Sequence, residues 1–303
     1  MIMSRFILLI FSLLLLGRVQ AADESMRFVY PTGESVGDVR HQYFWQLLDA
    51  ALASNTDKFG PYSLRAYDGT LPFQRAAAEV ASGTGLVNII ARATNPGLEK
   101  SLLPITLPLD KGLVGLRLFL VMPATQARLN SVKTQAELSN FSLGQGTNWG
   151  DLPILRQAGF NKLRLADNYQ SLFQMLAAGR FDLFPRGVSE IEAELLANQQ
   201  EIPDLMIERK FALRYPLAFI FYVPRTPEGE KMAERVADGL LRLQKNGGFE
   251  RLYGNYKALV LKNIQLAGRT VFVLPNSTTL RDLPALNDKA WWDDLGSQLA
   301  MPR

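Results

Sequence analysis

An arginine directly follows an apolar strand in the segment AAGRFDLFPRGVSE (177–190). The residues FDLFP (181–185) have the composition of a short buried strand, and Arg186 stands where small polar turn residues are usual. In α/β proteins, ligands bind at the carboxyl ends of the sheet strands. A guanidinium can bind a carboxylate through two parallel hydrogen bonds. Arg186 is therefore predicted to bind an anion; the alternative is an ion pair with a neighbouring carboxylate such as Glu190.

A glycine-containing turn offers a second candidate for anion binding. The segment LGQGTNWGD (143–151) leads from a predicted strand into a predicted helix over 148–159, so backbone N–H groups near Thr147 and Asn148 would lie at a helix N-terminus. Such an end carries about half a positive charge and binds carboxylate or phosphate. Asp151 in the same turn can complement the helix dipole without any ligand. The spacing matches neither G-x-G-x-x-G nor a GK[ST] loop, which argues against a nucleotide.

The residues of several common catalytic centres are absent from the sequence. The chain has no cysteine and a single histidine, His41, which we expect on the exposed side of a helix. One histidine excludes an H-E-x-x-H zinc site. The sequence therefore favours a binding protein over an enzyme, with no cofactor and no metal.

The elements that position these groups alternate between strand and helix. Strands are predicted over 26–33, 62–67, 86–92, 112–123, 141–146, 162–167, 181–185 and 216–224. Helices are predicted over 39–53, 70–82, 148–159, 168–179, 188–200 and 227–248. Strands separated by helices favour an α/β fold with parallel sheets and right-handed crossovers.

The length and composition are those of a globular protein with room for two domains. The chain has 303 residues, and a domain usually has roughly 100–200. Its 33 basic and 29 acidic residues are nearly balanced and form no Lys/Arg run. This balance argues against a nucleic-acid partner. We expect a monomer that binds a small-molecule solute.

The first 21 residues have the pattern of a signal peptide. Arg5 precedes the apolar run Phe6–Leu16, and Val19-Gln20-Ala21 fits the small-x-small pattern of a cleavage site. The alternative, an uncleaved anchor, needs about 20 apolar residues to span a bilayer. We therefore expect cleavage after Ala21 and export, most simply to a bacterial periplasm.

Four stretches resemble motifs of the type II periplasmic solute-binding proteins, in particular the amino-acid-binding components of ABC importers. They are TNPGLEKSLLPITLP (94–108), VKTQAELSNFSLGQGTN (132–148), ADNYQSLFQMLAAGRFDLF (166–184) and GGFERLYGNY (247–256). The resemblance implies a two-lobe α/β fold with a two-stranded hinge and a ligand cleft over which the lobes close. It implies an ABC permease as partner, or a membrane sensor as the alternative.

The resemblance also predicts where the chain divides. The first lobe would comprise 22–117 plus 223–303, and the second lobe 118–222. The hinge would lie near 117–123 and 219–224.

Two positions depart from the pattern of the amino-acid binders. That family holds the α-carboxylate with an arginine in the loop 94–108, where this chain has Leu98. It holds the α-ammonium with an aspartate just beyond the strand 181–185, where this chain has Gly187. The pair that recognises a free amino acid is therefore missing. Arg92, at the end of the preceding strand, is a candidate replacement for the missing arginine.

The resemblance completes the set of candidate ligand residues. The family stacks flat ligand groups on rings near these loops, which points to three aromatic side chains, although core packing is the alternative. The predicted ligand-binding residues are Tyr30, Tyr67, Arg75, Arg92, Asn95, Thr147, Asn148, Trp149 and Arg186. A few dehydratases share the fold and use carboxylates in the cleft. The corresponding acid–base candidates here are Glu34, Asp68 and Asp167.

Overall fold

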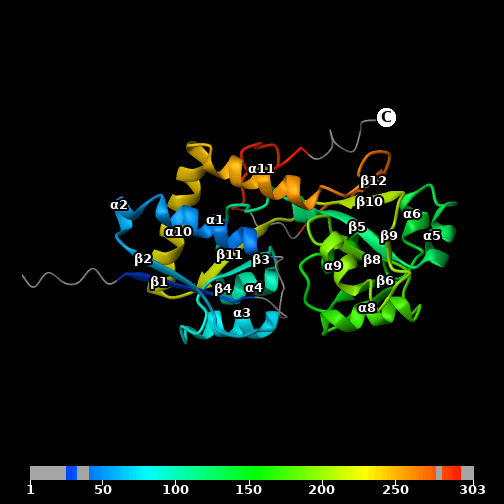
Figure 1. The fold of residues 1–303 in the computed structure, drawn as a ribbon, viewed down its shortest axis with the longest axis horizontal. Helices are drawn as coiled ribbons and strands as arrows, with labels where there is room; N and C mark the ends of the chain where they lie inside the picture. The colour runs from blue at the N-terminus through cyan, green and yellow to red at the C-terminus, as the bar shows by residue number, and fades with distance from the viewer. Residues whose placement is uncertain (1–24, 33–40, 278–281, 295–303) are drawn as a thin grey trace, which may run out of the picture.

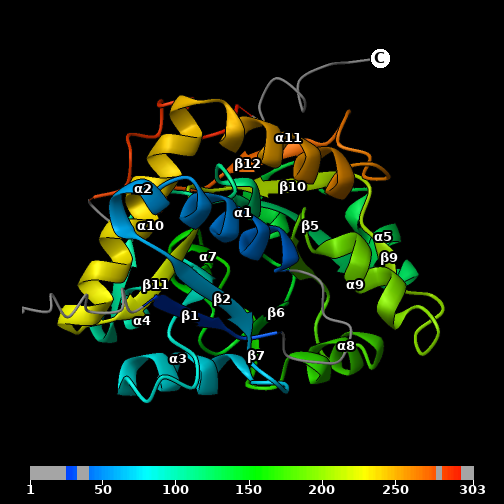
Figure 2. The same ribbon diagram turned by 60° about the vertical axis from the view of Figure 1, so that its left-hand side comes forward.

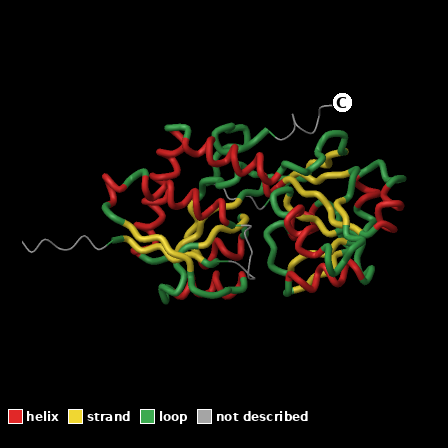
Figure 3. The backbone as a smooth tube through the Cα atoms, in the orientation of Figure 1, coloured by secondary structure: helices red, strands yellow, loops and turns green. Residues whose placement is uncertain are grey.

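The computed structural model describes residues 25–32, 41–277 and 282–294. These residues form two α/β bodies that lie side by side (Figure 1, Figure 3). We call them the first and the second lobe, defined by the strands given below.

The first lobe combines a parallel strand pair with a three-stranded antiparallel sheet. Its strands are β1 (Met26–Tyr30), β2 (Tyr62–Ala66), β3 (Ile90–Ala93), β4 (Leu102–Ile105) and β11 (Phe219–Pro224). Its helices are α1 (Gln42–Ala53), α2 (Thr56–Phe59), α3 (Phe73–Ser82), α4 (Pro96–Ser101), α10 (Pro227–Lys245) and α11 (Gly248–Val260). β1 pairs with β2, and β11 lies between β3 and β4. The apolar side of α1, which the spacing of its residues predicts, is buried and packs against α10.

The second lobe is built on a mixed sheet and a separate parallel pair. Its strands are β5 (Leu116–Val121), β6 (Leu143–Gly146), β7 (Leu163–Ala166), β8 (Phe184–Gly187), β9 (Met206–Ile207), β10 (Phe211–Arg214) and β12 (Thr270–Val273). Its helices are α5 (Pro123–Leu129), α6 (Gln135–Leu138), α7 (Leu152–Gln157), α8 (Tyr169–Ala177) and α9 (Ile191–Asn198). The main sheet has the order β12-β10-β5-β8, β9 also pairs with β5, and β6 pairs with β7.

The prediction of parallel sheets is only partly correct. The pairs β1–β2, β6–β7 and β10–β12 are parallel, whereas β5 and β11 run antiparallel to the strands beside them. Each of these two strands carries the chain into its sheet from the other lobe, so it runs against its neighbours. Strand–helix alternation in the sequence does not reveal this reversal.

The crossings between the lobes lie beside the predicted hinge rather than in it. The chain crosses through residues 106–115, which include the short 3₁₀ helix η1 (Leu113–Gly115), and through 215–218. The residues predicted as hinge belong largely to β5 and β11, which are paired inside the two sheets. The C-terminal region also differs from the prediction, because β12 lies at the edge of the second-lobe sheet, beside β10 (Figure 2).

The two crossing segments touch at Gly115 and Tyr215. The Tyr215 N–H donates to the Gly115 carbonyl oxygen at 3.1 Å. A Cβ atom on Gly115 would lie 2.1 Å from the Tyr215 carbonyl oxygen, far closer than atoms can approach. Glycine is therefore required for the two backbones to lie this close.

Replacing Gly115 by alanine should force the crossings apart. Overpacking of this kind costs about 1–3 kcal/mol, which lowers the melting temperature of a protein of this size by several degrees. Gly254 on α11 is a matched control, because it is exposed and an added Cβ meets nothing within 4 Å. Gly254→Ala should raise helix stability by about 1 kcal/mol. Thermal melting followed by circular dichroism compares the variants, and a wild-type melting temperature for Gly115→Ala would contradict the argument.

Candidate functional site

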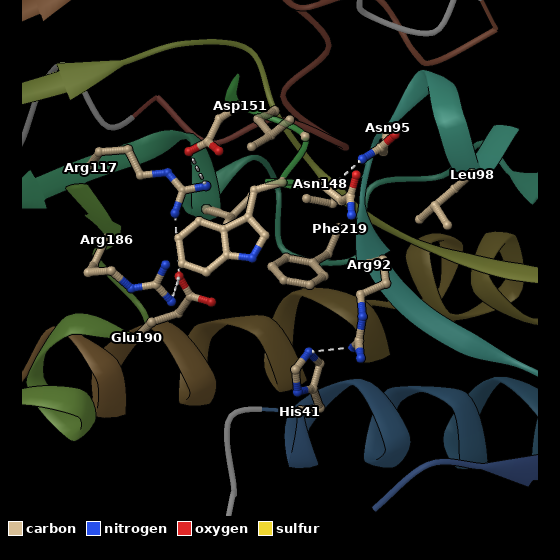
Figure 4. Close-up of a pocket in the computed structure, with 15 residues that line it drawn as sticks. His41, Arg92, Asn95, Leu98, Arg117, Asn148, Asp151, Arg186, Glu190 and Phe219 are labelled. Atoms are coloured by element: carbon tan, nitrogen blue, oxygen red, sulfur yellow. Dashed lines mark hydrogen bonds and ion pairs between the residues drawn. The ribbon is translucent and has the colours of Figure 1, made fainter. Parts of the chain in front are cut away.

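A cavity of about 100 Å³ lies between the two lobes, with walls from both (Figure 4). The first lobe and the crossings contribute His41, Arg92, Ala93, Asn95, Leu98, Val114, Leu217 and Phe219. The second lobe contributes Arg117, Asn148, Trp149, Gly150, Asp151, Arg186 and Glu190. Charged and aromatic side chains from segments far apart in the sequence thus meet around one small cavity.

Direct contacts between the lobes close one side of this cavity. The Asn95 side-chain amide donates to the Asn148 carbonyl oxygen at 2.9 Å. Next to it, a Cβ on Gly150 would lie 2.4 Å from the Thr94 carbonyl oxygen, so only glycine allows this approach. Asn95 also caps α4, because its Oδ1 accepts from the Gly97 N–H at 2.7 Å. The lobes are therefore closed against each other at this point.

The second-lobe wall centres on Arg117, a side chain that is only 5% exposed. Its Nη2 lies 3.2 Å from Asp151 and its Nη1 lies 3.4 Å from Glu190. Burial alone would lower the pKa of Arg117, but Tyr215 and the two carboxylates more than reverse this effect. The guanidinium is therefore charged and joins the loop at Asp151 to the start of α9.

Asp151 has a different role from the one that the sequence predicts. It is buried, and its two carboxylate oxygens accept from the Gln145 side chain at 2.6 Å and from the Tyr215 hydroxyl at 2.8 Å. The helix after it begins only at Leu152, and the Thr147 N–H donates to the Ala166 carbonyl at 3.2 Å. The helix therefore begins later than predicted, and the Thr147 N–H is already bonded within the protein; an anion-binding role for Asn148 stays a prediction.

Arg186 lies in the cavity wall, but its hydrogen bonds are directed mainly to protein carboxylates. Its Nε and Nη2 donate to the two oxygens of Glu194 at 2.6 and 2.5 Å, and Nη2 lies 3.3 Å from Glu190. The guanidinium also lies 4.5 Å from the centre of the Trp149 ring, within range of a cation–π interaction. The alternative of an ion pair with Glu190 is thus present, and the ligand role of Arg186 stays a prediction.

The first-lobe wall carries Arg92 and His41. Arg92 Nη1 lies 2.9 Å from His41 Nε2 and 2.9 Å from the Ala91 carbonyl oxygen. Because a guanidinium has only donors, the imidazole nitrogen must accept this bond. The histidine ring also packs edge-on against Phe219, with 5.8 Å between ring centres. His41 is therefore part of the cavity wall, and the expectation that it lies on the surface is wrong.

No known family profile and no curated protein matches the sequence, but solved structures match the fold. An amino-acid ABC transporter substrate-binding protein from Streptococcus pneumoniae, bound to L-arginine, aligns with a TM-score of 0.52 at 12% identity, over 77% of this chain and 94% of that one. A histidine kinase sensor domain with similarity to periplasmic binding proteins aligns with a TM-score of 0.52 at 14% identity, over 77% and 97%. The chain has the type II periplasmic-binding-protein fold.

A third match links the type II fold to an enzyme lineage. An ancestral amino-acid-binding protein, described as a precursor of cyclohexadienyl dehydratase, aligns with a TM-score of 0.52 at 13% identity, over 76% of this chain and 95% of that one. Of the three dehydratase candidates, Asp68 and Asp167 are exposed and are not among the residues that line the cavity. Glu34 lies outside the described residues.

Of the two departures from the type II amino-acid pattern, Leu98 lines the cavity and Gly187 lies beside two residues that line it. Leu98 forms part of its wall, so an apolar side chain stands where the pattern has an arginine. At Gly187 a Cβ would lie 2.8 Å from Glu190 Oε2 and 3.3 Å from Arg117 Nη1. The Glu190 carboxylate therefore occupies the space that a larger side chain at position 187 would fill.

Four predicted ligand residues lie away from the cavity. Tyr30 stacks on Trp45 at 4.5 Å between ring centres, and Tyr67 packs beside the apolar core under α3. Arg75 lies on the exposed side of α3 and pairs with Glu79 at 3.1 Å. Thr147 lines only a neighbouring groove of about 450 Å³. The other five, Arg92, Asn95, Asn148, Trp149 and Arg186, line the cavity.

Removing Arg186 should strongly destabilise the protein even without ligand. Arg186→Met removes the guanidinium that pairs with the buried Glu194, and breaking such a pair costs about 3–5 kcal/mol. Glu194 is 2% exposed, so water cannot replace the guanidinium. Arg180→Met is the control, because Arg180 is exposed.

A double variant separates the ion pair from packing. Arg186→Met combined with Glu194→Met should recover part of the loss, because apolar replacement of a whole buried pair is often near neutral. Urea unfolding of the four proteins measures these differences. If Arg186→Met unfolds at the urea concentration of the wild type, the pair does not support the lobe.

Proposed function

We propose that this chain is an exported solute-binding protein that encloses a small carboxylate-bearing solute between its lobes and delivers it to an ABC importer. The observation that carries this proposal is the cavity with walls from both lobes and with arginines among its lining residues. A site that is completed only when two lobes meet suits capture by closure.

The charges around the cavity support an anionic group in the solute. Three guanidiniums and two carboxylates line the cavity among the described residues. Both carboxylates belong to the second-lobe wall, where they are paired with Arg117 or Arg186. Arg92 lies on the opposite wall, beside His41 (Figure 4). We infer that Arg92 binds the carboxylate, because it takes the place of the arginine that Leu98 replaces.

The remaining walls indicate a compact solute with an apolar part. Leu98, Val114, Trp149, Leu217 and Phe219 line the cavity. Its volume of about 100 Å³ lies well below the roughly 300–1,000 Å³ of pockets for drug-sized ligands. The best fit is a small organic acid whose apolar part packs on the rings and whose carboxylate reaches Arg92.

The cavity favours binding over catalysis. Asp151 and Glu190, the carboxylates in its wall, are both held by Arg117 at 3.2 and 3.4 Å. Asp151 also accepts hydrogen bonds from Gln145 and Tyr215, and Glu190 accepts one from the Gly187 N–H, so protein donors hold both groups. Proton transfer of the dehydratase type is therefore not expected from these two groups.

Transport and sensing require the same cavity, and the matched structures include proteins of both kinds. We propose import as the main function and a membrane signalling partner as the alternative. The predicted signal peptide over 1–21 supports export. Among the described residues, no helix combines the length and the apolar character needed to cross a bilayer.

Arg92→Ala should abolish most of the binding of the carboxylate solute. A hydrogen bond to a charged group contributes about 1.5–3 kcal/mol, which is about a tenfold to hundredfold loss of affinity. The Arg75→Ala variant, which changes an exposed arginine of the same lobe, should bind the solute like the wild type.

Native mass spectrometry identifies a co-purified solute, and thermal shifts with carboxylic acids and their matching amides extend the search. An acid at a hundred times its dissociation constant should stabilise the wild type by about 2.7 kcal/mol. Equal shifts from acids and amides would overturn the proposed solute class.

Free α-amino acids should bind poorly. Leu98 provides no hydrogen bond for the α-carboxylate, and position 187 has no carboxylate side chain for the ammonium. The Glu190 carboxylate near that position is already paired with two guanidiniums. Calorimetric titration with the twenty common amino acids measures this, and micromolar or tighter binding of any of them would refute the prediction.

A further inference from the structure

The C-terminal region returns across the hinge after the two crossings expected for this fold. α11 begins among first-lobe residues, and the chain after it reaches Leu266 in the second-lobe core. β12 then joins the second-lobe sheet, and the chain returns to place Trp291 against Phe249 of α11. Figure 1 and Figure 2 both show α11 on the side of the molecule away from α3 and α8.

One end of this region is fixed to the second lobe. β12 pairs in parallel with β10, and the Thr270 N–H donates to the Lys210 carbonyl at 2.7 Å. The Leu274 N–H donates to the Arg214 carbonyl at 2.8 Å. Just beyond, Ser277 Oγ lies 2.8 Å from the Gln157 side-chain oxygen at the end of α7. This end therefore moves with the second lobe.

The other end is fixed to the first lobe through Asp293. Its Oδ2 accepts from the Tyr253 hydroxyl and from Lys257 Nζ, both at 2.6 Å and both on α11. Trp291 and Trp292 beside it are buried, at 6% and 7% exposure. The Asp293 carbonyl also accepts from Arg214 of β10 at 3.3 Å, so this end joins α11 to the second-lobe sheet.

Both parts of the C-terminal region also contact the crossing segments themselves. A Cβ atom added to Gly112 would lie only 2.7 Å from the Trp292 ring, so this ring packs directly on the glycine. The Asp293 N–H donates to the Lys111 carbonyl at 2.9 Å. The Asn276 amide donates to the Pro216 carbonyl of the second crossing at 2.7 Å. Lys111 and Gly112 have positive φ values of 49° and 74°. They lie in the loop between β4 and η1, and hinge rotation is usually absorbed by a few such loop residues.

We propose that residues 270–277 and 282–293 form a splint over the hinge that restrains the opening of the lobes. Bending either crossing requires backbone rotation at residues that Trp292, Asp293 and Asn276 hold. A protein with this restraint populates closed conformations more than a protein whose lobes are joined by the two crossings alone. Its apparent affinity is then closer to the intrinsic affinity of the closed site.

The experiment measures lobe separation without any solute. Ala78 on α3 and Ala177 on α8 are exposed, and both helices lie on the side opposite α11 (Figure 1). The chain has no cysteine, so Ala78→Cys and Ala177→Cys can carry the only two spin labels. Dipolar spectroscopy then gives the distance distribution in dialysed protein, with native mass spectrometry confirming that no solute remains. The result does not depend on the identity of the solute.

Two adjacent tryptophans provide a matched comparison. Trp292→Ala removes the ring that lies on Gly112, whereas Trp291→Ala removes a ring that packs on Phe249. Both should lower stability by similar amounts, because both rings are buried. Only Trp292→Ala should shift the distances between the labels to longer values.

A milder pair tests the same point if the tryptophan variants fold poorly. Asn276→Ala removes the hydrogen bond to the crossing at Pro216, and Ser277→Ala removes one to α7 of the second lobe. If the splint exists, the distances between the two labels should be longer and more broadly distributed in Asn276→Ala, and Ser277→Ala should keep the wild-type distribution. The proposal is overturned if Asn276→Ala and Trp292→Ala match the wild type, or if the controls broaden as much.

Discussion

The second-lobe wall of the cavity depends on two buried arginines that must keep their carboxylate partners. Arg117 on β5 and Arg186 on β8 lie on neighbouring strands, where Leu118 is the register partner of Arg186. Their partners come from elsewhere: Asp151 precedes α7, and Glu190 precedes α9. Taking ions out of water costs several kcal/mol each, so these groups are stable only together. Their mutual pairing fixes the loop that carries Trp149 and the start of α9 at the cavity.

This constraint links the wall to the hinge. Arg117 follows Gly115 by two residues, and Gly115 lies in backbone contact with Tyr215 of the other crossing. The Tyr215 hydroxyl in turn donates to Asp151 at 2.8 Å. A movement of the crossings therefore reaches the charged wall through a short chain of contacts. The cavity and the crossings between the lobes are parts of one packed unit rather than separate modules.

The sequence predicts the fold better than the contacts within the site. Strand–helix alternation and four motifs indicate the two-lobe architecture, and five of nine predicted ligand residues lie in the cavity wall. Tyr30 and Tyr67 pack in the first lobe instead, because a ring at a strand end is readily covered by a neighbouring helix or loop. His41 and Arg92 meet only after folding, since 51 residues separate them. Arg117 was not among the predicted ligand residues, although the sequence marks it as the single charged residue in the apolar run 112–123.

The contacts between Asn95 and Asn148 and between Thr94 and Gly150 have a kinetic consequence. If the proposed solute binds in the cavity, these contacts block its exit on one side. Parting of the lobes would open that side, so the residence time would depend on how often the lobes part. Affinity differences among related solutes would then appear mainly in how strongly each one slows that parting.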